Sequence, residues 1–330
     1  MTSLWPSSYK DSLVKGLELL LSDPHCFLIG EDVQDPYGGA FAITKGLSTR
    51  FPGKVVNTPM SEQGFTGMGV GMALAGFRPI IEIMFGDFST LILDQLLNHA
   101  AKFVEGFDRP IHMAVRTPMG GYRGYGATHS QSLERLLVGW PHIAVVSPSV
   151  LNAPGQLLVK SMELGVPVFF VENKLDYTRW MFLSETMAEA FELQYHGKDF
   201  PIIEAGFPNE EAAVTVISYG GMVHPLLHLM YDLYMEEEVA VRLLDISMLH
   251  PLDVDLIYSL VKNERRILTV EEGPVPFGVG DGIISEMAQR GVKARFQRVG
   301  ARQHIIGASL DAEKRALPQM DEIKAIILEG

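Results

Sequence analysis

Short apolar runs alternate with helical apolar repeats through the first half of the chain. Leu13, Leu17 and Leu20 recur at helical spacing, and Phe27-Leu28-Ile29 follows as an expected strand. Further strands are expected near residues 55–56, 78–85, 111–115, 143–146 and 168–171, and a helix is expected around residues 93–101. Strands separated by helices form parallel sheets covered on both faces, so we predict an α/β fold. In such sheets, ligands gather at the carboxyl ends of the strands.

A change of pattern separates two predicted domains. Residues 186–210 have weak periodicity and contain two glycines and two prolines. A second αβ series follows, with strands expected at residues 213–218, 239–244 and 267–270 and helices expected from Val223, Val254 and Gly280. We therefore predict a first domain over residues 1–185, a linker over 186–210 and a smaller second domain over 211–330.

The segment from Asn57 to Phe65 places one acidic side chain at the start of a glycine-rich helix. Ser61 suits the N-cap, and Glu62 falls in the first turn, where the helix dipole favours a carboxylate. Each glycine inside a helix costs about 1 kcal/mol relative to alanine. Such a helix is expected where another backbone or a ligand approaches closely. The alternative is a tightly packed buried helix with a glutamate in its capping turn.

A second unusual segment runs from Gly120 to Gln131. Four glycines precede His129, which hydroxyl and amide side chains flank. A glycine-rich loop lets the backbone approach a ligand, and a histidine at its end can exchange a proton near neutral pH. The alternative is a solvated loop that ends in a helix cap at Ser130 or Ser132.

Composition and charge argue against several classes of function. The net charge of −13 argues against a nucleic-acid interface, which needs clustered basic residues. No apolar run approaches the length of a membrane span, and no cluster has the spacing of zinc ligands. Cys26 is the single cysteine, so no disulfide can form within the chain, and no secretory signal is visible. These features lead us to expect a cytoplasmic protein that binds neither nucleic acid nor membranes.

In their order along the chain, these segments resemble one family, the beta subunits of the thiamine diphosphate-dependent decarboxylating component of 2-oxoacid dehydrogenase complexes. The matching segments include Gly30-Glu31-Asp32-Val33, Thr58 to Phe65, Asp87-Phe88, His129 to Ser132, Ser218-Tyr219-Gly220, Pro251-Leu252-Asp253 and Val270 to Gly273. The resemblance covers nearly the whole chain. It implies a parallel-sheet, transketolase-like pyrimidine-binding domain followed by a smaller α/β domain that resembles the transketolase C-terminal domain.

The resemblance implies an active site shared with an alpha subunit, in a heterotetramer of two alpha and two beta chains. The partner would hold magnesium and the diphosphate, and this chain would hold the aminopyrimidine. Glu62 would bond the pyrimidine ring nitrogen and so promote loss of the thiazolium proton. Phe88 would stack on the pyrimidine, Met84 would contact its face, and Glu31 would join the polar route between two cofactors. His129 would aid acyl transfer to a lipoyl group.

Each of these residues also has a purely structural alternative. Phe88 would otherwise be a core aromatic, Met84 a filler of gaps and Glu31 a turn residue. The substrate implied is a small 2-oxo acid, and a lipoyl acyltransferase core is a further implied partner. The sequence identifies neither the 2-oxo acid nor the acyl acceptor.

The chain departs from the family pattern at several positions. Gly280-Asp281-Gly282 resembles the start of a magnesium-diphosphate motif, but residues 300–315 lack the asparagine that completes it. We therefore interpret it as a packing turn. The segment 103–108 is unlike the family's, and Arg123 lies in the loop that leads to His129. Asn152 stands where an acid is common, in a region that often helps to hold a structural potassium ion, which leaves that ion open.

These departures keep two other hypotheses open. One is a split, transketolase-like enzyme that passes an acyl or two-carbon unit to an acceptor other than lipoyl. The other is a noncatalytic scaffold that assembles through residues 211–330. Because Glu62 and His129 are both present, the sequence favours the enzyme over the scaffold.

Overall fold

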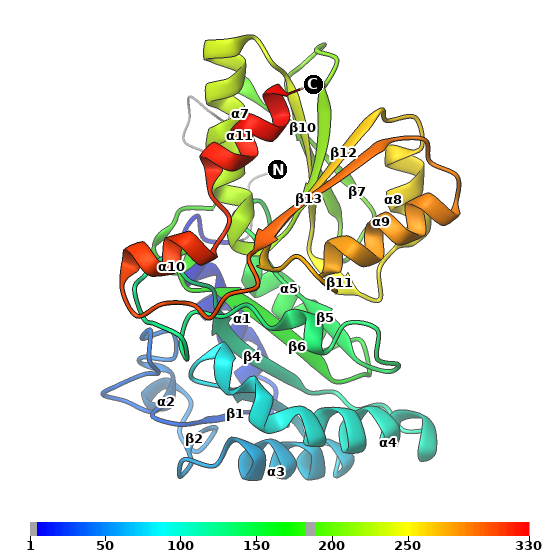
Figure 1. The fold of residues 1–330 in the computed structure, drawn as a ribbon. Coiled ribbons are helices and arrows are strands. Elements are labelled where there is room, and N and C mark those ends of the chain that lie inside the picture. The colour runs from blue at the N-terminus through cyan, green and yellow to red at the C-terminus, as the bar shows by residue number, and fades with distance from the viewer. Residues whose placement is uncertain (1–4, 182–188, 330) are drawn as a thin grey trace.

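The structure is a computed structural model that describes residues 5–181 and 189–329. Two sheets, each flanked by helices, form two α/β domains that lie one above the other in Figure 1. The end of the predicted first domain, residues 182–185, and the start of the predicted linker, residues 186–188, lie outside the described residues.

The first domain contains a seven-stranded sheet with the order β11-β5-β6-β4-β3-β1-β2. Its strands other than β11 pair in parallel. They are β1 (Cys26–Gly30), β2 (Val55–Asn57), β3 (Arg78–Glu82), β4 (Ala114–Met119), β5 (Ala144–Val146) and β6 (Val168–Asn173). The expected strands are therefore present, although β4 begins three residues later than residue 111.

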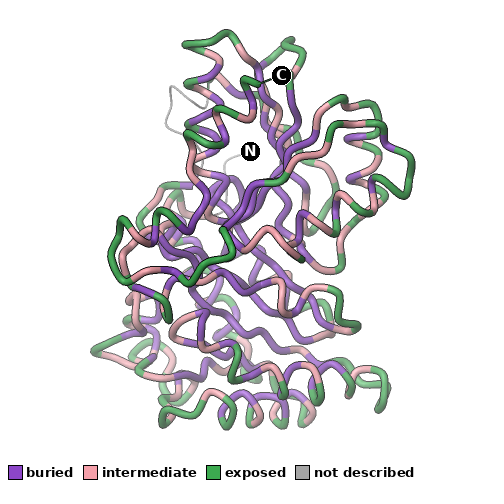
Figure 2. The backbone as a smooth tube through the Cα atoms, viewed as in Figure 1, coloured by how far each residue is buried: buried purple, intermediate pink, exposed green. Residues whose placement is uncertain are grey.

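Alternate residues of these strands point into two hydrophobic cores, one on each face of the sheet. Ile80 and Phe170 join a core with α1 (Tyr9–Leu21) and α5 (Pro154–Ser161). Ile81 and Phe169 join a core with α3 (Glu62–Leu74) on the opposite face. Figure 2 shows the resulting buried backbone along the strands. Burial on both faces explains why the strands read as continuous apolar runs.

The helix expected around residues 93–101 is irregular. A 3-10 helix, η1 (Gly86–Ile92), leads into a π-helix, η2 (Gln95–Ala100), and then into α4 (Ala101–Gly106). The apolar spacing still directs Leu96, Ala100 and Ala101 into the core. Single π-type turns are frequent near functional sites, and this one follows the segment that carries Phe88.

The second domain contains a six-stranded sheet with the order β13-β12-β9-β10-β8-β7. The strands are β7 (Glu192–His196), β8 (Ile202–Gly206), β9 (Val214–Ser218), β10 (Val241–Ile246), β12 (Arg266–Pro274) and β13 (Arg295–Ala301). Figure 1 shows α7 (Val223–Glu237) and α11 (Met320–Leu328) on one side of this sheet, and α8 (Val254–Val261) and α9 (Val279–Gln289) on the other.

Two features of this domain differ from the sequence prediction. The predicted linker contains β7 and β8, which pair antiparallel at the edge of the second sheet. Most β7 side chains are exposed or half-buried, so this edge strand lacks a clear apolar signal. The strand β11 (Met248–His250) leaves the second domain and pairs antiparallel with β5, which fastens the domains together.

Candidate active site

The predicted site residues gather at the carboxyl edge of the first sheet. Glu31 directly follows β1, Met84 lies two residues beyond β3, and the loop from Gly120 to Gln131 follows β4. Glu62 begins α3, which follows β2. Because β4, β3, β1 and β2 are neighbours in the sheet, these segments share one edge, where ligands of parallel sheets bind.

Glu31 and Glu62 form an electrostatically coupled pair at this edge. Burial and then the charge of Glu62 raise the pKa of Glu31 above its usual range, against an opposing hydrogen bond from the Ser61 backbone. One carboxylate oxygen of Glu31, Oε1, is buried and unpartnered among the described residues. The half-buried Glu62 carboxylate likewise makes no hydrogen bond or ion pair within the described chain. A buried polar atom normally has a partner, so this pair is suited to a donor from outside the chain.

The local structure around Glu62 modifies the expected cap. Ser61 occupies the N-cap position of α3, but its side chain makes no capping hydrogen bond. Among the helix glycines, a Cβ at Gly69 would lie 2.8 Å from the Ile81 side chain, so contact with the sheet requires this glycine. A Cβ at Gly71 would meet nothing within 4 Å. Close packing inside the chain therefore accounts for only part of the glycine content of α3.

Phe88 and His129 are brought together by η1 and the glycine-rich loop. Their rings meet edge to face at a centroid distance of 5.4 Å and an interplanar angle of 79°. Phe85 lies still closer to His129, at 4.6 Å and 78°. Thr128 Oγ1 lies 2.9 Å from His129 Nδ1. The imidazole is therefore oriented by two aromatic rings and one hydroxyl group, and Phe85 is a contact that the sequence analysis missed.

Not all predicted residues make direct contacts with one another. Met84 is half-buried at the same edge of the sheet. The Glu31–Glu62 pair and the Phe88–His129 pair share no hydrogen bond in the part of the chain that the structure describes. Beneath the loop, Gln131 Nε2 donates to Asp87 Oδ1 over 2.7 Å, which ties the loop to η1.

A buried ion network supports this edge from below. Arg116 of β4 donates to Glu172 of β6 over 2.8 and 2.6 Å, and it also bonds Glu82 of β3. Tyr177 donates its hydroxyl to Glu172 over 2.6 Å. Burial raises the pKa of Glu82 even though Arg116 opposes this shift. The network links three adjacent strands, β3, β4 and β6, and so holds in place the sheet from which the site segments extend.

The paired acids Glu271 and Glu272, in the second half of β12, are buried at the junction of the domains. Glu271 accepts hydrogen bonds from Val279 N at 3.0 Å and Gly280 N at 3.1 Å. Its carboxylate therefore occupies the N-terminus of α9, where a diphosphate motif would bind phosphate. Glu272 accepts from Asn173 over 2.9 Å and from the backbone of Gly121. Burial raises the pKa of both carboxyls to about 7.

The region around Asn152, where the sequence leaves a structural potassium ion open, is a compact polar cluster. Asn152 Oδ1 accepts from Ser149 N over 3.0 Å, and Asn152 Nδ2 lies 3.3 Å from Asp245 Oδ2. Ser149 also donates its hydroxyl to Asp245 over 2.5 Å. The amide oxygen of Asn152 is thus already engaged by the Ser149 backbone. Whether potassium binds here stays an open question. Among the described residues, no group of three or more His, Cys, Asp or Glu side chains could hold a metal ion.

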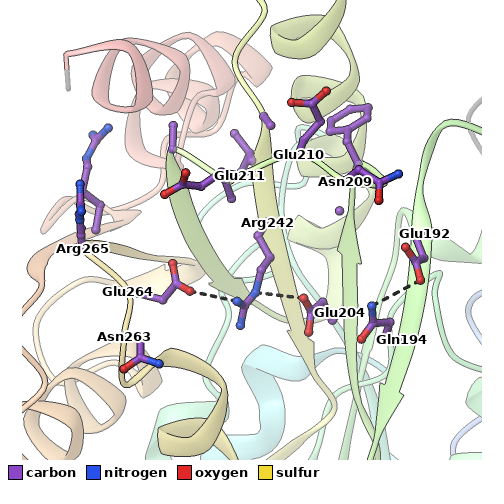
Figure 3. Close-up of a pocket in the computed structure, with 17 residues that line it drawn as sticks. Glu192, Gln194, Glu204, Asn209, Glu210, Glu211, Arg242, Asn263, Glu264 and Arg265 are labelled. Atoms are coloured by element: carbon purple, nitrogen blue, oxygen red, sulfur yellow. Dashed lines mark hydrogen bonds and ion pairs between the residues drawn. The ribbon is translucent and has the colours of Figure 1, made fainter.

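An open hollow of about 740 Å³ lies elsewhere, in the second domain. Figure 3 shows Arg242 between Glu204 and Glu264, which it contacts at 3.2 and 3.0 Å. The hollow adjoins Ala213 and Ala240, next to the starts of β9 and β10, and no predicted site residue lines it. Its central cation is already neutralised, so this hollow does not match the predicted chemistry. No helix within the described ranges is long and apolar enough to span a membrane.

Comparisons with known proteins agree with this architecture. Residues 16–179 match the transketolase pyrimidine-binding domain, and residues 204–323 match the transketolase C-terminal domain. A solved structure described as an inactive beta4 tetramer of a split-gene transketolase has a TM-score of 0.71 at 18% identity, and covers 97% of this chain and 96% of that chain.

Two pyruvate dehydrogenase subunits are more similar to this chain in sequence than the split-gene transketolase is. The mitochondrial pyruvate dehydrogenase E1 component subunit beta-1 of Arabidopsis thaliana is 32% identical, over 93% of this chain and 84% of its own length. The corresponding beta subunit of Staphylococcus epidermidis is 31% identical over 92% of both chains. The chain therefore belongs to the family of pyruvate dehydrogenase E1 beta subunits, with a transketolase pyrimidine-binding domain and a transketolase C-terminal domain.

Proposed function

We propose that this chain is the beta subunit of a thiamine diphosphate-dependent 2-oxoacid dehydrogenase that decarboxylates its substrate and acylates a lipoyl group. It supplies the pyrimidine half of an active site that is completed by an alpha subunit. One observation carries this proposal: Glu31 Oε1 and the Glu62 carboxylate, which have no partner among the described residues, lie at the same sheet edge as Phe88 and His129. The similarity to named pyruvate dehydrogenase beta subunits supports it.

The side chains at this edge fit the pyrimidine end of the cofactor. A nitrogen heterocycle needs a carboxylate that can share a proton with its ring nitrogen, and Glu62 has no other partner in the described chain. It also needs an apolar contact surface, which Phe88 and Met84 would provide. The unsatisfied oxygen of Glu31 suits a polar group at the same edge. When bound, thiamine diphosphate supplies the electron sink for decarboxylation.

We assign the diphosphate end of the cofactor to the alpha subunit. The N-terminal backbone groups of α9 already bond Glu271, so the glycine turn at residues 280–282 offers no open phosphate cradle. The alpha subunit would therefore hold the diphosphate and magnesium. This division of the site also predicts that the isolated chain is inactive.

His129 is proposed to act in acyl transfer. Thr128 engages its Nδ1, and its Nε2 has no hydrogen-bond partner among the described residues. The imidazole can therefore hold or release a proton at Nε2 while the aromatic rings of Phe85 and Phe88 keep its orientation. The proposed acceptor is a lipoyl group carried by an acyltransferase core.

The proposal is tested by isolating the alpha partner with this chain and assaying a panel of 2-oxo acids. The assay contains magnesium, thiamine diphosphate and an artificial electron acceptor. We expect decarboxylation by the assembly and none by either chain alone. Activity of the isolated chain would overturn the shared site. Transfer of a two-carbon unit to an aldose, without acylation of a lipoyl domain, would favour the transketolase-like alternative.

A further inference from the structure

Lys174 is a buried cation beside the proposed acyl-transfer residue. It directly follows β6, and its side chain is fully buried. Its Nζ donates a hydrogen bond to the backbone carbonyl oxygen of His129. The same nitrogen lies over the ring of Phe85 at 5.6 Å and over that of Tyr125 at 5.7 Å. No carboxylate forms an ion pair with it in the described parts of the chain.

Burying the Lys174 ammonium destabilises the fold unless its charge makes a favourable contact. A buried ammonium without a paired carboxylate loses its hydration. The carbonyl oxygen, the two aromatic faces and the charges of Asp87, Glu272 and Glu313 offset only part of that loss, because the pKa of Lys174 is still lowered. An apolar side chain of similar length would fill the same space at lower cost. The charge is therefore better explained by the segment that it binds than by packing.

A second contact fastens the same loop to the same residue. Arg123 donates from its guanidinium to the backbone carbonyl of Lys174 over 3.2 Å, and it lies 5.3 Å above the ring of Tyr125. The loop that carries His129 is thus attached to the end of β6 through both the backbone and the side chain of Lys174. The ring of Phe85 contacts both the Lys174 ammonium and the His129 imidazole.

We propose that Lys174 is a positioning residue that holds the main chain of His129 and thereby keeps the imidazole packed against Phe85 and Phe88. The consequence for acyl transfer rests on the proposed function, whereas the contact itself does not. In this role Lys174 acts through His129 and does not touch the substrate.

The buried position of the Lys174 ammonium predicts that the packing of the His129 loop depends on pH. Burial, with a smaller contribution from the charge of Arg123, lowers the pKa of Lys174 to about 8. The charges of Asp87, Glu272 and Glu313 oppose this shift, and Tyr125 and His129 are the other titratable groups against the ammonium. Above that pH the amine is neutral, so its attraction to the aromatic faces is lost. The neutral amine still donates to the His129 carbonyl, but more weakly, so the loop is held less tightly on this side.

The test measures His129 directly in the full chain, by NMR with 13C at the histidine Cε1 positions. The His129→Asn variant identifies the signal of His129. We expect that signal to be shifted by the rings of Phe85 and Phe88 and to change again near pH 8, as Lys174 loses its proton. In Lys174→Met, the ring-induced shift should decrease at every pH, and the change near pH 8 should disappear.

Two further variants make the test decisive. Lys174→Arg keeps a positive charge throughout the range, so its His129 signal should keep the low-pH position above pH 8. Lys293→Met removes an exposed lysine of the second domain and should leave the signal unchanged. A wild-type His129 signal in Lys174→Met would overturn the proposal, as would persistence of the change near pH 8 in Lys174→Arg. Because no turnover is measured, this result is independent of the test of the proposed function.

Discussion

The phenol oxygen of Tyr219 in the second domain lies 2.7 Å from Glu134 Oε1 in the first domain. The same oxygen lies 3.0 Å from Glu271 Oε2. A phenol has one proton to donate, so it can donate to only one of these carboxyls. The other carboxyl must carry a proton of its own to bond the phenol. Burial raises the pKa of both Glu134 and Glu271, which favours such a shared proton at the domain junction.

This junction predicts that stability falls as the pH rises. Glu271 and Glu272 titrate near pH 7 in the folded chain, whereas an unfolded glutamate titrates at about 4.3. Between these values the folded state binds more protons, so the free energy of unfolding decreases with increasing pH. We expect a loss of roughly 1 kcal/mol per carboxyl between about pH 6 and about pH 8, measured by urea unfolding.

The Glu272→Gln variant tests the origin of this dependence. It removes one titrating group, so the decrease in unfolding free energy between the two pH values should become smaller. Glu211→Gln alters an exposed carboxylate and should leave the decrease unchanged. An equal pH dependence in all three proteins would show that the buried carboxyls do not titrate as described.

The buried network around Arg116 predicts a large effect on stability. Arg116→Leu leaves Glu82 and Glu172 buried without their cation, which should cost about 3–5 kcal/mol. Arg50→Ala removes the ion pair between the exposed Arg50 and the half-buried Glu18 and should cost less than about 1 kcal/mol. Thermal and chemical unfolding of both variants measure the difference. Equal losses would mean that the buried network adds no more than a surface pair.

The sequence predicted those parts of the fold in which apolar spacing is regular. The parallel strands of both sheets other than β13, and the helices α1, α3, α7, α8 and α9, follow from such spacing. The short strand β11 and the edge strand β7 escaped prediction, because a three-residue strand and a largely exposed strand carry little periodic signal. The π-helix η2 escaped because its apolar residues keep the spacing of an ordinary helix.

The candidate site likewise contains residues that the sequence could predict and residues that it could not. Glu62 and His129 stand in unusual local segments, so the sequence alone singled them out. Lys174, by contrast, contacts residues that are far away in sequence. Its ammonium bonds the carbonyl of His129 and lies over the ring of Phe85. The contact of Tyr219 with Glu134 likewise joins two domains. Such contacts are created by folding and leave no local pattern.

Phe88 is predicted to contribute to cofactor affinity. Phe88→Ala removes the proposed stacking surface and one of the rings that orient His129, so thiamine diphosphate should bind about tenfold more weakly, equivalent to roughly 1.4 kcal/mol. Titration calorimetry of the reconstituted assembly measures this change. Phe77→Ala disrupts a similar edge-to-face pair with Phe27, at 5.6 Å and just before β3, and should leave the affinity unchanged. An equal loss in both variants would argue against a role for Phe88 at the cofactor.

The most direct measurement is the turnover of a Glu62→Gln variant, reconstituted with the alpha subunit under saturating thiamine diphosphate and magnesium. Glutamine keeps the size of the side chain but cannot take up the proton, so we predict a loss of about 10²- to 10⁴-fold in kcat. The Glu211→Gln variant should retain the wild-type rate. Wild-type turnover by Glu62→Gln would contradict the proposed half-site.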